Sequence, residues 1–192
     1  MRSYIFGYGS LIIPESVTKS LGRHIDKEDI SLVEVNDFTR LWRLVVQVIV
    51  NYDGNERPVN AVFLDIQKLP GKIINGSLIE VSEEDLNNLD IREKQYDRID
   101  ITESVTSRLQ GQYRIFTYTG KPEFHVKHYD NPMILKQYLN VLDGIGEWGD
   151  NFYQRFTSTT EPNNYPIIDG NYKFLDKQQN IVTGHPENLS QL

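Results

Sequence analysis

The stretch Tyr4–Leu11, with the sequence YIFGYGSL, constrains the fold more than any other part of the chain. Its first three residues are aromatic or β-branched, which predicts a short strand that is buried on both faces. Gly7 and Gly9 then end the strand. Glycine is the usual residue where the backbone takes a positive φ or approaches another group closely, so we expect a tight turn here.

A helix is expected directly after this turn. Pro14 suits the first position of a helix over residues 14–21, and Gly22 is a stop signal. A strand, a glycine turn and a helix start leave backbone N–H groups without acceptors, and such groups can bind an anion. The sequence therefore predicts either an anion site or an ordinary turn with structural glycines.

Three common motifs are excluded at this turn. The dinucleotide fingerprint G-x-G-x-x-G fails at Ile12, and a phosphate-binding loop would need a lysine that is absent. A nucleophile elbow centred on Ser10 would need glycines at positions 8 and 12. Any anion bound here is therefore expected to be of another kind.

Length and charge exclude several classes of protein. A chain of 192 residues fits one domain, or one domain with a tail. The net charge of −7 argues against a nucleic-acid partner, because phosphate binding depends on Lys and Arg. No apolar run approaches the ~20 residues that span a bilayer, and the first strand begins too early for a signal peptide. We expect a cytoplasmic protein with no membrane partner.

Metal and thiol chemistry are not expected. The chain has no cysteine, which excludes disulfides, thiol nucleophiles and cysteine metal sites. His125 and His128 lie three residues apart, but no nearby carboxylate motif completes a metal-ligand set. A solvated loop pair is the favoured interpretation, and no metal or cofactor is predicted.

The remaining pattern predicts a mixed α+β fold. Turn residues separate predicted strands over 31–35, 40–50, 59–66, 73–81, 97–107 and 112–119. Helices are predicted over 82–92 and 132–142, with a further helical turn over 148–156. Gly76 lies inside a strand, which indicates a bulge or a tightly curved sheet. We expect a small, curled, mostly antiparallel β-barrel with flanking helices.

The second informative stretch is the helix that begins after Ser82. Ser82 and Asp85 have capping-box spacing. Leu86 and Leu89 mark the inward face, and helical spacing places Glu93 on that same face. A buried carboxylate is costly unless it is paired. Either a neighbouring arginine, Arg92 or Arg98, forms an ion pair with Glu93, or the carboxylate is functional.

Taken together, these motifs resemble the γ-glutamylcyclotransferase superfamily. FGYGSL at residues 6–11 is similar to its first signature, and GSLIEV at 76–81 followed by L-x-x-L-D-x-x-E-x-x-Y at 86–96 is similar to its second. FTRLW at 38–42, and the helix over 132–142 with a glycine and a tyrosine after it, give weaker matches. The resemblance covers residues 4–157, so we expect a domain over 1–157 and a coil-rich tail over 158–192 that packs on or near it.

The resemblance implies an enzyme that converts a γ-glutamyl amine or γ-glutamyl amino acid to 5-oxoproline and a free amine, without metal or cofactor. It implies a cavity between the glycine turn and Glu93, with Glu93 as general acid and base. The implied binding residues for the substrate's α-carboxylate are Gly7, Tyr8, Gly9, Ser10 and Leu11.

Several alternatives remain open. Tyr118 could donate to the reaction's oxyanion or pack in the core, and Arg40 could form a structural ion pair or contact a carboxylate. The tail could cover the pocket or form the contact of a homodimer. The protein could also be a non-catalytic binding or interaction module on the same fold, or an unrelated barrel that binds small anions.

Overall fold

A long hairpin forms the backbone of the fold in the computed structural model, which describes residues 1–107 and 109–185. Strand β2 (Ile30–Tyr52) pairs antiparallel with β3 (Asn55–Val81) along its length. The predicted turn between them is the two-residue loop Asp53-Gly54, with φ of 50° and 76°. Positive φ at both loop residues matches the right-handed twist of the strands, and Asp-Gly is a preferred pair for it.

The sequence predicted a break within each strand of this hairpin, at residues 36–39 and 67–72, but both strands are continuous there. Asn36-Asp37 was expected as a bend, but the chain keeps its pairing on both sides and shifts register between Asn36 and Phe38. Asp37 takes a φ of 62°, and its carboxylate accepts a hydrogen bond from the Gly71 N–H at 2.8 Å. The turn-like residues on both strands therefore face each other in one bulge, which bends the ribbon without ending it.

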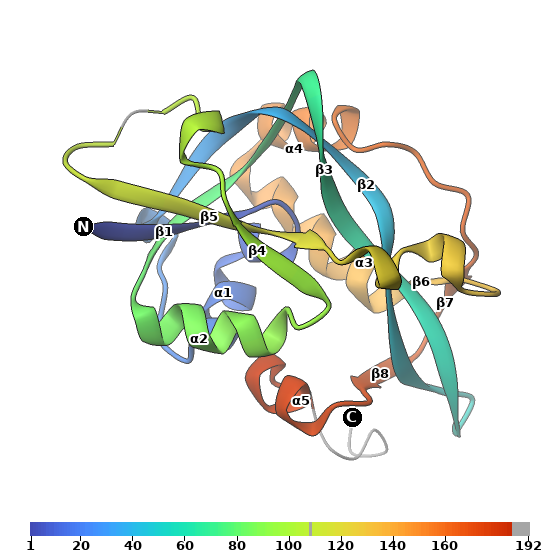
Figure 1. Cartoon of the computed structure of the whole chain (residues 1–192). Helices are drawn as coiled ribbons and strands as arrows, with labels where there is room; N and C mark the ends of the chain where they lie inside the picture. Colours follow the sequence, from blue (N-terminus) through green and yellow to red (C-terminus); the bar gives the residue numbers. More distant parts are fainter. Residues whose placement is uncertain (108, 186–192) are drawn as a thin grey trace.

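The main sheet has six strands in the order β4-β5-β1-β3-β2-β8. The pairing of β1 with β5 is parallel, and the other four pairings are antiparallel. The four further strands are β1 (Arg2–Gly7), β4 (Tyr96–Asp100), β5 (Tyr113–Gly120) and β8 (Asn171–Phe174). The predicted mixed α+β class with a curled, mostly antiparallel sheet is confirmed (Figure 1). The sheet forms a half-barrel, and β4 is shorter than the predicted strand over 97–107.

Five helices flank the sheet among the described residues: α1 (Pro14–Leu21), α2 (Glu83–Arg92), α3 (Lys136–Asp143), α4 (Asp150–Ser158) and α5 (Lys177–Thr183). Helix α1 and its stop at Gly22 agree with the sequence, and so does the capping box of α2. Helix α3 begins four residues later than predicted, because Ile134 and Leu135 form strand β6 and pair with β7 (Ile167–Ile168).

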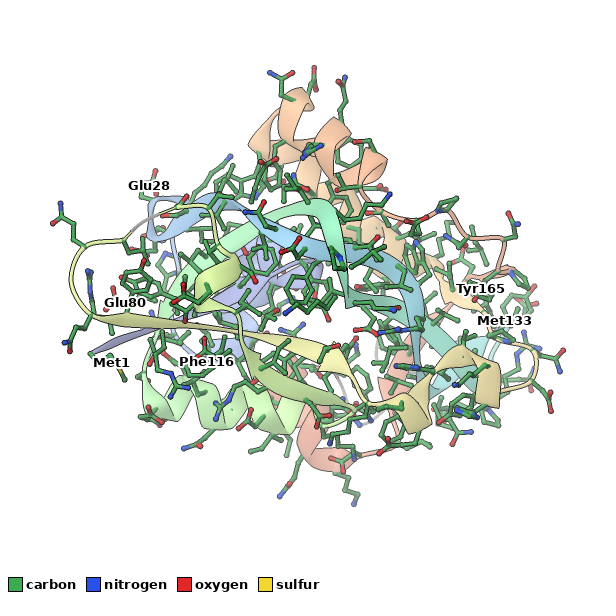
Figure 2. All side chains as sticks on the ribbon, turned by 45° about the horizontal axis from the view of Figure 1, so that its top comes forward. Met1, Glu28, Glu80, Phe116, Met133 and Tyr165 are labelled. Atoms are coloured by element: carbon green, nitrogen blue, oxygen red, sulfur yellow. The ribbon has the colours of Figure 1, made fainter. Side chains whose placement is uncertain are left out.

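The core lies on both faces of β1. Tyr4 and Phe6 join the larger apolar cluster inside the curl, and Ile5 joins the cluster beneath α1 and α2. The predicted burial of this strand on both faces is confirmed. Figure 2 shows Met133 and Tyr165 at one end of the molecule and Met1 and Glu80 at the other.

The predicted coil-rich tail contains regular structure. Strand β8 pairs antiparallel with β2, and α5 packs against α2 (Figure 1). Residues 186–192 of the predicted tail lie outside the described residues. Across residues 1–107 and 109–185, no helix has the length and apolar character needed to span a membrane.

Candidate active site

Two glycines let the loop after β1 fold back onto the sheet. A Cβ at Gly7 would lie 2.7 Å from the Leu11 Cβ and 2.8 Å from the Ser77 Oγ. A Cβ at Gly76 would lie 2.5 Å from the Phe6 ring. Close approach of neighbouring groups therefore requires both glycines, and no register shift occurs at Gly76. The Ser77 hydroxyl donates to the Leu11 carbonyl at 2.9 Å and holds the loop in place.

A cavity of about 340 Å³ lies between this loop, α2 and the C-terminal elements. This volume is in the range of small-molecule sites. All seven residues that the sequence analysis names for the site contribute to its lining: Gly7, Tyr8, Gly9, Ser10, Leu11, Glu93 and Tyr118.

The glycine loop lines this cavity and contains backbone N–H groups without an acceptor in their own helix. Its residues Ser10–Ile12 form a 3₁₀ helix, in which the Ile12 N–H donates to the Gly9 carbonyl at 3.0 Å. The N–H groups of Ser10 and Leu11 come before the first acceptor of that helix, so no bond within the helix satisfies them. This is the local geometry that the sequence predicts for an anion.

Glu93 caps the C-terminal end of α2. Its N–H donates to the Leu89 carbonyl at 2.8 Å, and its side chain is 16% exposed. Burial raises the pKa of the Glu93 carboxyl, and the nearby Arg92 guanidinium lowers it by less. The carboxylate therefore lies on the inward side as predicted, and burial there raises its pKa.

Arg92 joins Glu93 to the glycine loop. Its Nε lies 3.1 Å from the Glu93 Oε1, and its Nη2 donates to the Ser10 Oγ at 2.9 Å. Its Nη1 donates to the Ser20 Oγ on α1. Of the two arginines that the sequence offered to Glu93, Arg92 therefore makes the contact. Arg98 contacts Asp90 instead, at 3.5 Å.

The Tyr118 hydroxyl already has an acceptor. It donates to the Asp90 Oδ1 at 2.7 Å, and its side chain packs in the cluster beneath α1 and α2. Burial, and then the bond to Asp90, raise the pKa of the Tyr118 hydroxyl. Tyr118 thus lines the cavity but packs as a core residue, with its proton directed to Asp90.

Among the described residues, Arg40 makes neither the ion pair nor the carboxylate contact expected from the sequence. It is fully buried, does not line the cavity, and forms no ion pair with any described residue. Its Nη1 donates to the Phe156 carbonyl at 3.1 Å, and its guanidinium lies 4.0 Å from the centre of the Phe156 ring. Arg40 therefore binds the C-terminal end of α4, where the helix dipole favours a cation. Burial lowers the pKa of Arg40 to about 9.

Helix α5 holds the residues on both sides of Glu93. The Gln179 Nε2 donates to the Arg92 carbonyl at 2.7 Å and to the Gln95 Oε1 at 3.1 Å. The Lys94 Nζ lies 2.6 Å from the Asp176 Oδ2. Figure 1 shows α5 directly beside α2. Of the roles left open for the tail, the structure therefore shows that its described part forms a wall of the cavity.

Sequence reasoning missed several residues that line the cavity. Tyr138 on α3 is one of them, and a Cβ at Gly9 would lie 3.1 Å from its hydroxyl oxygen. Tyr172, Phe174 and His185 belong to the tail. The helical pattern over 132–142 could have drawn attention to Tyr138, but the coil-like composition of the tail gave no signal for the others.

The histidine pair lies after β5, where His128 ends a short 3₁₀ turn. No group of three His, Asp or Glu side chains with metal-binding geometry occurs in the described parts of the chain. The His125 Nε2 lies 3.1 Å from the Gly120 carbonyl, so this ring serves a loop contact.

Known proteins resemble this chain in fold, but no family model and no curated protein matches its sequence. Among solved structures, a gamma-glutamyl cyclotransferase superposes with a TM-score of 0.56 at 17% identity, over 96% of this chain and 99% of its own. An uncharacterized protein from Homo sapiens gives 0.53 at 19%, over 93% and 96%. YkqA from Bacillus subtilis gives 0.52 at 15%, and this chain covers 53% of its length.

The chain therefore has the γ-glutamyl cyclotransferase-like fold. The resemblance expected from the motifs is confirmed at the level of the fold. The superposition extends beyond residues 4–157, because 96% of the chain is covered. The identities are too low to carry an activity from these structures to this protein.

Proposed function

We propose that the protein is a γ-glutamyl cyclotransferase, which converts a γ-glutamyl amine or γ-glutamyl amino acid to 5-oxoproline and a free amine. One observation carries the proposal. A mostly buried carboxylate with a raised pKa, Glu93, lines the same cavity as the glycine loop, in which the N–H groups of Ser10 and Leu11 have no acceptor within their 3₁₀ helix. A base beside an anion site is what this cyclisation needs.

The substrate's glutamyl half fits the polar side of this cavity. Its α-carboxylate would accept hydrogen bonds from the N–H groups of Ser10 and Leu11. Arg92, which already bonds to the Ser10 hydroxyl, adds a positive charge beside the same loop. Binding the α-carboxylate there brings the neighbouring α-ammonium group towards Glu93, which is joined to Arg92.

Glu93 would move protons in both halves of the reaction. It takes a proton from the α-ammonium group, so that the α-nitrogen can attack the γ-carbonyl carbon of the same molecule. The new C–N bond closes the five-membered ring, and the old amide C–N bond breaks. The α-nitrogen loses two protons in all, and the leaving amine gains two, so no other reactant is consumed.

The oxyanion of the tetrahedral intermediate needs a hydrogen-bond donor. Loop N–H groups are one source. Tyr118 was the tyrosine predicted from sequence, but its proton goes to Asp90. Tyr138, whose hydroxyl oxygen lies beside Gly9, is the better tyrosine donor for a substrate bound at the loop.

A second reading is a non-catalytic binding module. The contact between Arg92 and Glu93 favours it, because an ion pair keeps the carboxylate ionised without any substrate. Burial nevertheless outweighs Arg92 in its effect on the Glu93 pKa, which is why we prefer the enzyme.

The test is 5-oxoproline release by the purified protein over a panel of γ-glutamyl compounds. Glu93→Gln keeps the shape of the side chain but removes the base, so we expect release to fall by at least about a hundredfold while the melting curve stays cooperative. Glu84→Gln, at an exposed position on the same helix, is the matched control and should keep full activity. Normal turnover by Glu93→Gln would refute the role of Glu93. A folded wild type that releases nothing would favour the binding module.

A further inference from the structure

One side of the cavity is a continuous set of rings, which we call the aromatic wall: Phe63, Tyr138, Tyr172, Phe174 and His185. Phe63 connects Tyr138 and Tyr172, with ring centres 4.8 and 6.4 Å from its own. His185 lies 4.5 Å from Tyr172 and 5.0 Å from Phe174. The wall thus runs from the glycine loop, beside which Tyr138 lies, to the end of α5.

The aromatic wall carries no charge near neutral pH. Burial, followed by the charges of Arg92 and Lys19, lowers the pKa of His185 to about 4. Burial also raises the pKa values of the tyrosines at positions 138 and 172. The imidazole and both phenols are therefore neutral at pH 7, and the wall offers ring faces and edges to whatever binds against it.

The charged side chains of the cavity come from other elements and have partners. Arg92 on α2 is held by Glu93 and by hydroxyls of the loop and α1. Lys19 on α1 is largely exposed and pairs with Glu15 at 2.8 Å. Both cations of the cavity lining thus already have a carboxylate partner among the described residues. A charged group bound there would lose its water without gaining a partner, which is costly.

We propose that the aromatic wall binds the amine half of the substrate, and that this half is uncharged and apolar, with an aromatic ring preferred. The inference rests on the proposed function, because the loop and Glu93 must hold the glutamyl half. Apolar and aromatic groups gain affinity from burial against such rings, whereas a carboxylate on the leaving group loses it.

Four substrates separate the two effects. They are the γ-glutamyl derivatives of ethylamine, phenethylamine, alanine and phenylalanine, which differ only by a ring, a carboxylate or both. We expect the ring to raise kcat/KM for 5-oxoproline release by at least about tenfold in each pair, which is the size of effect that apolar pockets show. We expect the carboxylate to lower it by a similar factor. If the substrates with a ring had the same kcat/KM as those without it, or a lower one, the inference would be wrong.

A variant of the wall checks that the preference arises there. Phe174→Leu keeps an apolar side chain but removes a ring that lines the cavity, so the ratio of kcat/KM for phenethylamide over ethylamide should fall several-fold. Phe116→Leu is the matched control, because Phe116 lies on β5 outside the cavity lining and should leave the ratio at its wild-type value. An unchanged ratio in a folded Phe174→Leu protein would place the preference elsewhere and refute the inference.

Binding separates this inference from the proposed activity. Calorimetric titration of Glu93→Gln with the phenethylamide and the ethylamide measures the same preference without turnover. If the wild type converts no substrate but the phenethylamide binds about tenfold more tightly than the ethylamide, the proposed activity is refuted and the aromatic site is supported. If both bind equally, or neither binds, the aromatic site is refuted whatever the activity.

Discussion

Two opposing effects act on the pKa of Glu93. Its side chain is mostly removed from water, which disfavours the charged form, and Arg92 at 3.1 Å favours it. The sequence predicted the inward position, because Leu86 and Leu89 define a face that Glu93 continues. It did not predict the surroundings of Arg40, because these include the Phe156 carbonyl and the Thr160 hydroxyl, more than a hundred residues away in the chain.

The pH dependence of stability tests the burial of Glu93. Its folded-state pKa lies above the usual 4.5, so the folded protein binds more protons than the unfolded chain just above that pH. The stability that Glu93 contributes is thus present below pH 4.5 and is lost as pH rises through the folded-state pKa. We expect the unfolding free energy of the wild type, relative to Glu93→Gln, to fall as the pH rises above 4.5. Urea denaturation of both proteins at each pH measures it. Parallel pH profiles would contradict the raised pKa.

Elements formed by long-range pairing were the hardest to predict. Asn36-Asp37 and the Pro-Gly pair after Leu69 both have turn composition, yet they lie opposite each other in a paired ribbon and produce a bulge. Helix α5 has few apolar residues, and contacts made far along the chain hold it in place. Local features sufficed for α1 and α2, where a proline, a capping box and a terminal glycine mark the ends.

Gln179 tests the contact between α5 and α2. Gln179→Ala leaves the Arg92 carbonyl and the Gln95 side-chain oxygen without their buried donor, so we expect a loss of about 1–3 kcal/mol in unfolding free energy. Turnover should also fall, because the residues on both sides of Glu93 lose their support. Gln178→Ala, at an exposed position on α5, is the control and should change stability by less than about 0.5 kcal/mol. Equal denaturation midpoints for the two variants would show that α5 is held by other contacts.

At the scale of the molecule, Asp65 holds the curl of the sheet. Strand β1 lies between β3 and β5 in the sheet, yet the Asp65 carboxylate on β3 accepts from the Gly120 N–H at the end of β5, at 2.7 Å. The same carboxylate accepts from the Arg43 Nε on β2, at 2.8 Å. Asp65 is fully buried, so these bonds are shielded from water. Strand patterns predicted a curled sheet but could not identify the residue that joins its strands across β1.

Asp65→Asn should therefore loosen the whole sheet. The neutral amide cannot balance the charge of Arg43, whose side chain is 18% exposed. We therefore expect the unfolding free energy to fall by about 2–4 kcal/mol. Asp100→Asn breaks an exposed pair with Arg114 and should cost less than about 1 kcal/mol. Chemical denaturation of both variants gives the comparison. Similar losses of unfolding free energy in the two variants would mean that the Asp65 contacts stabilise the protein no more than an exposed ion pair does.

The central place of β1 in the sheet has a consequence for biosynthesis. Both partners of β1 follow it in the chain, and Ser77, the β3 residue that pairs with Gly7, comes 70 residues after it. At a translation rate of ~5–20 residues per second, the apolar segment from Tyr4 to Phe6 has no ladder partner for several seconds. Any other exposed strand edge can compete for it during that time. Rapid closure of the local β2–β3 hairpin then supplies the missing edge and ends this exposure.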